Sequence, residues 1–283
     1  MGIVIRMIKR KKPMDWVRCL LVWGSGLIAV TVLFYLVGFV LIRGIPHVKP
    51  SLFAFTYTIE NQSLFPALVT TVIMVVLTLV LAVPFGIFTA IYLVEYAKRG
   101  SRLVRIIRMT AETLAGVPSI VYGLFGYIFF VDVLGWGKSI LAGCFTLAIM
   151  ILPIIMRTTE ESLKSIPDSY REGSFSLGAG RLRTVVRVVL PPSMPGIFAG
   201  VILSVGRIVG ETAALIYTIG SVIQIPNSLF SQGRTLALHV FQLSSQGHHR
   251  DEAYGTAVIL LVLVIGINAL SSAIERRFRN RLQ

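Results

Sequence analysis

Long apolar runs separated by short polar segments dominate the chain. A helix needs about 20 predominantly apolar residues to cross the hydrocarbon core of a bilayer, and six runs come close to or exceed that length. Only the fifth is interrupted by charges, at Arg207 and Glu211. The pattern predicts an all-α polytopic membrane protein with six transmembrane helices, over residues 20–42, 64–94, 113–131, 139–156, 196–219 and 253–274.

The ends of these runs divide the chain further. Residues 1–19 form a basic amino terminus, residues 64–274 a core of five spans, and residues 275–283 a basic carboxyl terminus. The first run follows basic residues, as in a signal peptide, but it is longer than a typical signal core and no small-residue cleavage site follows it. We therefore expect it to be retained. In the second run, Pro66 predicts a helix start and Pro84 a kink.

The composition supports the membrane assignment and alters how the net positive charge of the chain is interpreted. The chain is 55% hydrophobic and 14% charged, against about 25% charged residues in soluble domains, and its mean hydropathy is +0.79. A formal net charge of +14 would suggest nucleic acid for a soluble protein. Here the basic residues lie between the apolar runs, so we expect membrane lipid and no nucleic acid as a partner.

The basic residues also predict the orientation. Lys and Arg number 6, 2, 5, 1, 6, 2 and 4 in the seven polar segments taken in chain order, with Arg207 left inside a run. Cytoplasmic loops carry the excess of positive charge. Both termini are therefore predicted to lie in the cytoplasm, and the protein in the cytoplasmic (inner) membrane.

The loop at 157–195 is the longest on the predicted cytoplasmic side. Pro167 suits a helix start, Asp168 and Glu172 suit its first turns by charge, and Gly178 and Gly180 suit its end. Tyr170 and Phe175 provide the bulky side chains that a docking helix needs. The following segment intersperses Arg181, Arg183 and Arg187 among valines, as an interfacial segment does.

This loop resembles a family signature. The segment EGSFSLGAGRLRTVVRVVLP is similar to the E-A-A-x3-G-x9-I-x-L-P loop of the permeases of ATP-binding cassette (ABC) importers. Glu172, Gly178, Leu190 and Pro191 match at the family's spacing, while two small residues replace the alanines and a valine the isoleucine. The resemblance implies a coupling helix that docks on a cytoplasmic ATPase, made by Asp168, Tyr170, Arg171, Glu172, Gly173, Ser174, Phe175, Leu177 and Gly178.

Arg207 and Glu211 are the charged pair inside the fifth run. Four residues apart on one helix, they would share a face, and a central Arg costs about 2.5–3.5 kcal/mol on insertion scales. In the functional interpretation, Arg207 faces a transport pathway and attracts an anion, Glu211 holds or releases that anion, and Thr212 adds a hydroxyl. A structural ion pair between helices explains the residues equally well, and Gly206 and Gly210 form a general packing motif.

The third run contains LAGVPSIVYGLFG. Pro118 lacks a backbone donor, Gly116, Gly123 and Gly126 permit close approach, and Ser119 and Tyr122 offer hydroxyls to a pathway. A kinked, tightly packed helix is the simpler explanation of each residue taken alone.

Together, AGVPSIVYGLFG and RIVGETAALIYT resemble the membrane subunits of the high-affinity phosphate importer, and GETAAL and the short chain resemble the PstA type more than its PstC partner. The resemblance implies the type I ABC importer permease fold and a phosphate pathway. It also implies pairing with a homologous PstC-type permease, two ATPase subunits and a phosphate-binding protein. The chain itself is expected to need no cofactor, since ATP and Mg would bind the partner ATPase.

Other interpretations remain open beside phosphate import. GWGKS lacks the first glycine of a phosphate-binding loop, and HHRDE at 248–252 suits a solvated outer loop better than a metal site, so we expect neither an enzyme nor a metal centre. The outer loop contains a candidate helix over 236–243. The alternatives are a permease for another oxyanion, a secondary anion transporter and a membrane enzyme. The secondary transporter is disfavoured because no paired internal repeat with interrupted helices is evident and because the coupling loop would then have no purpose, and the enzyme because no catalytic cluster is evident.

Overall fold

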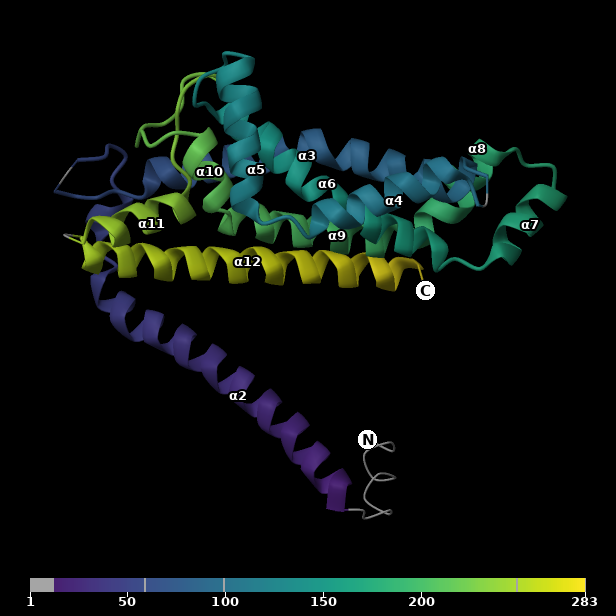
Figure 1. Cartoon of the computed structure of the whole chain (residues 1–283), viewed down its shortest axis with the longest axis horizontal. Coiled ribbons are helices and arrows are strands. Elements are labelled where there is room, and N and C mark those ends of the chain that lie inside the picture. The colour runs from purple at the N-terminus through teal and green to yellow at the C-terminus, as the bar shows by residue number, and fades with distance from the viewer. Residues whose placement is uncertain (1–12, 59, 99, 248, 283) are drawn as a thin grey trace.

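The computed structural model describes residues 13–58, 60–98, 100–247 and 249–282, and within them every regular element is a helix (Figure 1). Three π-helical segments extend or join α-helices, and two 3-10 turns follow the first helix. The elements are α2 (Pro13–Gly44), η1 (Ile45–His47), η2 (Pro50–Phe53), α3 (Phe65–Ile91), η3 (Tyr92–Tyr96), α4 (Arg102–Ala115), α5 (Ser119–Gly126), η4 (Tyr127–Val133), α6 (Ile140–Lys164), α7 (Asp168–Ser176), α8 (Arg181–Thr184), η5 (Val185–Val189), α9 (Leu190–Gly210), α10 (Ala213–Thr218), α11 (Leu236–Gln246) and α12 (Arg250–Leu282).

Most of the predicted spans are confirmed. Five helical stretches of the described chain are long and apolar enough to cross a membrane, or six if the bent pair formed by α4 and α5 with η4 counts as one span. Pro66 lies in the first turn of α3, as predicted, and α3 continues through Pro84. The carboxyl-terminal helix runs beyond the predicted end at residue 274 as far as Leu282, and α11 confirms the helix predicted over 236–243.

The third span differs from the prediction of one helix over 113–131. The helix α4 ends at Ala115 and α5 begins at Ser119, and the two axes are bent by 103°. Pro118 explains the break, because it has no N–H for the helix ladder and disfavours helical backbone at Val117. The polar side chains of α4, which include Arg105 and Glu112, also make it unlike a lipid-embedded helix.

The fifth span and the loop before it also need correction. The predicted helix over 196–219 begins earlier, as α9 at Leu190, and is broken after Gly210, with α10 following. The loop predicted over 157–195 is shorter, because α6 extends to Lys164 and a nearly continuous helix starts at Arg181. Pro191 and Pro192 lie in the first turn of α9, directly after η5, and Pro195 lies inside the helix, where its missing N–H removes one helical hydrogen bond.

The core is built around α6, which packs against α3 and α9 (Figure 1). Its large apolar side chains, such as Leu147, Ile151 and Ile155, are fully buried. Close packing is possible because glycines face α6: a Cβ at Gly86 would lie 2.7 Å from the Ile155 side chain, and one at Gly200 would overlap Thr158. In turn α12 packs against α9 and α11.

The helix α2 leaves this bundle. Figure 1 shows it diverging from α12, with its amino-terminal end far from the other helices. Contacts are confined to its carboxyl-terminal end, where Gly44 lies against Tyr254 and Val258 and the rings of Phe39 and Tyr254 are 6.0 Å apart. None of the most apolar stretch of α2 is buried within the chain.

Candidate functional site

The two helix breaks lie together, because α5 packs directly on α10. A Cβ at Gly123 would lie 2.9 Å from both Cα and the carbonyl oxygen of Ala214, and one at Gly126 would overlap Thr146 of α6. Gly123 and Gly126 therefore permit the close approach predicted for them, whereas Gly116, predicted with them, has only backbone oxygens of the preceding helix turn within 4 Å of a Cβ. The result places the broken third and fifth spans side by side in the membrane core.

Glu211 occupies the break between α9 and α10, not the face of a helix. Its backbone is extended, with φ −74° and ψ 128°, and its carboxylate accepts a hydrogen bond of 3.1 Å from the N–H of Ala214. The carboxylate thus satisfies one of the free donors at the start of α10. The prediction that Arg207 and Glu211 share a helix face is wrong, because the helix ends at Gly210 between them. Thr212, partly buried, is the other residue of the break.

Arg207 is therefore left without the predicted partner. It lies in the last turn of α9, is partly exposed, and makes no hydrogen bond or ion pair with the residues that the structure describes. It interacts electrostatically with the Tyr122 hydroxyl. A guanidinium within a span, with its hydrogen-bond donors unused, is suited to bind an anion.

The two hydroxyl residues of the third span have different surroundings. Tyr122 is buried, and its hydroxyl donates a 2.7 Å hydrogen bond to the carbonyl of Leu114, in the last turn of α4. Tyr122 therefore ties α5 across the bend to α4. Ser119 is the first residue of α5 and is partly exposed.

On the opposite side of the bundle, α7 forms as the sequence predicts. Pro167 precedes its first turn and Asp168 begins it. At its end, Gly178 has φ +80°, and its N–H bonds to Phe175 O while the N–H of Ala179 bonds to Ser174 O. These two bonds form a Schellman motif, which terminates a helix through a left-handed glycine. Gly180, predicted to share that role, has an ordinary φ of −71°.

Most side chains of α7 and of the residues that follow it directly are exposed. Tyr170 is 57% exposed, Phe175 46% and Leu177 90%, and Asp168, Glu172 and Gly173 are exposed as well. Ser174 instead bonds to Thr184 through their hydroxyls, at 2.8 Å.

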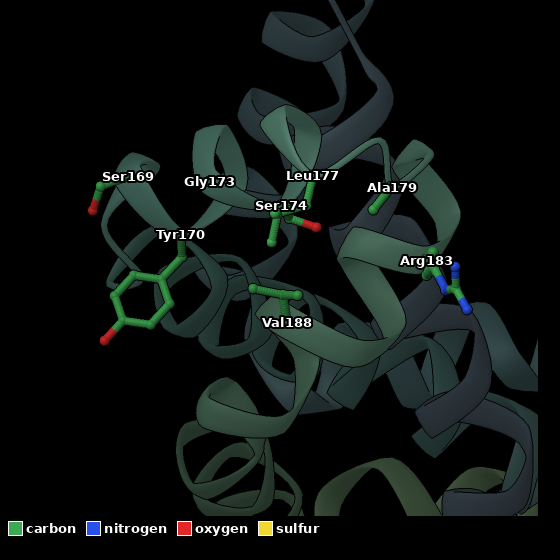
Figure 2. A pocket seen from close by; sticks show the side chains of 8 residues that line it. All are labelled: Ser169, Tyr170, Gly173, Ser174, Leu177, Ala179, Arg183 and Val188. Atoms are coloured by element: carbon green, nitrogen blue, oxygen red, sulfur yellow. The ribbon is translucent and has the colours of Figure 1, made fainter.

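A pocket of about 440 Å³ opens between α7 and the helix that follows it (Figure 2). Tyr170, Gly173 and Leu177 line it from one side, and Arg183 and Val188 from the other. An exposed helix with aromatic side chains beside a mixed apolar and basic pocket is suited to contact another protein.

Arg171 is the exception on α7, since its side chain is only 13% exposed. Its guanidinium pairs with Glu95 of η3, at 2.7 Å between Nη2 and Oε1. Arg171 was predicted to belong to the coupling helix surface, and Glu95 was not among the predicted site residues. The available signal was weak: Glu95 is the first charged residue after the second apolar run.

A second buried carboxylate was also missed. Glu160 of α6 is 7% exposed and pairs with Arg108 of α4 at 2.6 Å and with Lys164 at 2.5 Å. The pair with Arg108 attaches the amphipathic α4 to the central helix. The charges of α4 are thus partly explained by contacts inside the chain.

A polar cluster at the other end of the bundle joins α11 to the loop before α3. The buried His239 lies 6.3 Å from the Tyr57 ring, centroid to centroid. Arg234 Nη1 donates to Nδ1 of His239 at 3.4 Å, and Nε2 of the ring lies 3.4 Å from the carbonyl oxygen of Gln62. Since Nδ1 accepts, Nε2 carries the proton and donates to Gln62. Burial, and then the nearby Arg234, lower the pKa of His239 to about 4.

This cluster predicts an acid-sensitive stability. His239 binds a proton below about pH 6.5 when unfolded but only near pH 4 when folded, so protons favour the unfolded state between these values. The free energy of unfolding should fall by up to about 3 kcal/mol as pH drops from 6.5 to 4. Thermal unfolding of the purified protein across this range measures it. His239→Gln should flatten the dependence, and an unchanged slope in that variant would contradict the assignment.

The chain was compared with protein families, curated proteins and solved structures. Residues 82–283 match the family described as "Binding-protein-dependent transport system inner membrane component". The chain is 32% identical to "Phosphate transport system permease protein PstA" of Mycobacterium leprae, over 96% of this chain and 92% of that protein. It is 38% identical to PstA 1 of Mycobacterium tuberculosis strain CDC 1551, over 69% of this chain and 65% of that protein, so the match spans just under two thirds of that relative's length.

Solved structures show the same fold. The methionine ABC transporter MetNI, in inward-facing conformations, matches with a TM-score of 0.60 at 20% identity, over 76% of this chain and 94% of that one. A bacterial ABC transporter for the acidic polysaccharide alginate matches with a TM-score of 0.64 at 14% identity, over 94% and 99%. The predicted ABC importer permease fold and the resemblance to PstA-type permeases are thus confirmed. This chain belongs to the family of inner membrane components of binding-protein-dependent transport systems.

Proposed function

We propose that the chain is the permease subunit of an ABC importer that carries inorganic phosphate across the inner membrane. The observation that carries the proposal is the match to PstA of M. leprae over nearly the full length of both chains. Phosphate is the substrate named for that relative, and a guanidinium with unused donors inside a span suits an oxyanion. Arg207 with Ser119, Tyr122, Glu211 and Thr212 forms the proposed pathway, where the two broken spans meet.

The proposed partners correspond to surfaces that this chain leaves uncovered. A homologous permease of the PstC type covers the apolar length of α2, of which none is buried here. Two ATPase subunits serve the pair, one docking on α7 through Tyr170, Phe175 and Leu177. The ATPases bind ATP and Mg, both termini lie in the cytoplasm, and a phosphate-binding protein approaches the opposite end of the bundle, at α11.

A secondary anion transporter is the second candidate, and one observation favours it. Such transporters bind substrate where transmembrane helices are interrupted, and the structure has two interrupted spans, at Gly116–Pro118 and at Glu211–Thr212. The sequence disfavours this candidate because no paired internal repeat with interrupted helices is evident in it, but the structure supplies the interruptions. The exposed α7 still favours the ABC importer, because a transporter that works alone has no use for a projecting aromatic helix.

Proteoliposomes that contain the assembled transporter test the proposal. ATP-dependent uptake of phosphate is expected, and Phe175→Ala should weaken ATPase association by about 2 kcal/mol, roughly thirtyfold, as loss of an aromatic anchor does. Phe230→Ala, which removes an exposed aromatic ring from the outer loop, is the matched control and should leave association unchanged. Phosphate uptake of normal rate without any ATPase subunit would contradict the proposal and support the secondary transporter.

A further inference from the structure

All the hydrogen-bond donors of the Arg171 guanidinium bond to groups within this chain. Nε and Nη2 donate to the carboxylate of Glu95 at 2.7–3.3 Å. Nη1 donates to Ile166 O at 2.8 Å and Asp168 Oδ1 at 3.3 Å, and Nη2 also donates to Leu163 O at 3.0 Å. A guanidinium has five N–H donors in one plane, and these contacts account for all five. No donor remains for a partner protein.

The contacts connect three elements that are distant in sequence. Glu95 lies in η3, at the end of the second span, 76 residues before Arg171. Leu163 and Ile166 belong to the end of α6 and the turn after it. The Leu163 carbonyl also accepts a long bond of 3.4 Å from the N–H of Ile166, so Arg171 supplements the weak backbone bonding at this helix end. Both charged side chains are largely buried, at 6% exposure for Glu95 and 13% for Arg171, so removing either partner would leave the other charge buried without its counterpart.

We propose that the Glu95–Arg171 pair is a rigid link through which movement of α7 reaches the ends of α3 and α6. Arg171 is then a positioning residue and not part of the surface that touches the ATPase. The inference rests on the proposed function, because it takes α7 to be the element on which the ATPase acts.

The rest of the attachment of α7 is weaker. Outside the link, α7 is joined to the rest of the chain by its two chain connections and by packing against α8 and η5, and the hydroxyls of Ser174 and Thr184 make a 2.8 Å hydrogen bond there. A neutral hydrogen bond of this kind contributes less than a bidentate charged one. Without the Glu95 carboxylate, α7 would be free to move relative to α3 when its partner pulls on it.

Swapping the two residues, with Arg at position 95 and Glu at position 171, is not a suitable test of the link. A carboxylate at position 171 would face the carbonyl oxygens of Leu163 and Ile166, which can only accept hydrogen bonds. Suitable variants are Glu95→Gln, which removes the charge with little change of shape, and Arg171→Lys, which keeps the charge but loses the planar fork. Glu161→Gln is the matched control, since this exposed carboxylate pairs with Arg157 on the same face of α6 and does not contact α7.

Hydrogen exchange of the assembled transporter in lipid nanodiscs tests the link without reference to substrate. In Glu95→Gln the amides of residues 165–180 should exchange about tenfold faster than in the unmodified protein, and Glu161→Gln should not change them. If Glu95→Gln does not assemble, the same exchange measurement is made on Arg171→Lys. Unchanged exchange in the assembled variant would overturn the link.

Transport measurements then test what the link does. ATP hydrolysis and phosphate uptake are measured in the same proteoliposomes, and in Glu95→Gln the phosphate imported per ATP hydrolysed should fall about fivefold with hydrolysis retained. Equal losses of hydrolysis and uptake would overturn the positioning role, because they indicate lost docking. If the unmodified transporter imports no phosphate, the proposed function fails, while the exchange experiment still decides whether the link exists.

Discussion

Arg207→Ala is expected to reduce phosphate uptake roughly 30- to 150-fold, because a lost hydrogen bond to a charged group costs about 2–3 kcal/mol. The side chain makes no hydrogen bond or ion pair within the described chain, so its removal should leave folding and assembly nearly unchanged. Arg207→Lys keeps the positive charge but not the two-pronged geometry that fits an oxyanion, and should show a smaller loss. Initial rates of uptake by the assembled transporter provide the measurement.

The control for this experiment is Arg157→Ala. Arg157 is also basic, but it is 60% exposed and pairs with Glu161 at the end of α6, so uptake should remain near normal. If Arg207→Ala assembles and transports at the normal rate, Arg207 has no part in the pathway. If instead the variant fails to assemble, the residue acts as a structural contact between helices, which the sequence alone left open.

Gly123→Ala is expected to destabilise the region where α5 meets α10. The new methyl group would lie 2.9 Å from backbone atoms of Ala214, and backbone cannot move aside as a flexible side chain can. Inserting a methyl group into a packed interior of this kind costs about 1–3 kcal/mol. Thermal unfolding of the purified transporter should show the loss, and uptake should fall because the two breaks are pushed apart.

Gly116→Ala provides the comparison on the same span. Its backbone φ is −87°, and the nearest atom to an added Cβ lies 3.5 Å away, so the methyl group has space. We expect this variant to retain both stability and transport. Equal destabilisation by the two substitutions would show that the effect comes from the glycine itself and not from the α5–α10 contact.

Local features of the sequence were sufficient to predict most of the spans and the helix α7. Bilayer crossing depends on apolar length, which can be read directly from a run such as 64–94. The ends of α7 depend on Pro167 and Gly178, whose effects act over a few neighbouring residues. For the same reason the Schellman motif forms at the expected glycine, although the second glycine considered, Gly180, is not needed.

The features that failed depend on contacts between distant segments. A helix through Arg207 and Glu211 is acceptable locally, but the Glu211 carboxylate caps α10 and the chain turns extended there. The 103° bend before α5 has a local cause in Pro118, yet its size depends on packing against α10. The position of Glu95 after an apolar run marks it only weakly, and nothing in either segment specifies that Glu95 pairs with Arg171.

The attachment of α2 at one end has a consequence for how the subunit diffuses in the membrane before assembly. At 1.5 Å per residue, its 32 residues extend about 48 Å, and they are held to the bundle at one end only. All backbone groups of such a helix are satisfied internally, so it is stable in lipid by itself. An unassembled subunit consequently occupies a variable area of the membrane, while an assembled one has a fixed outline. The lateral diffusion of the two forms should therefore differ by more than their masses imply.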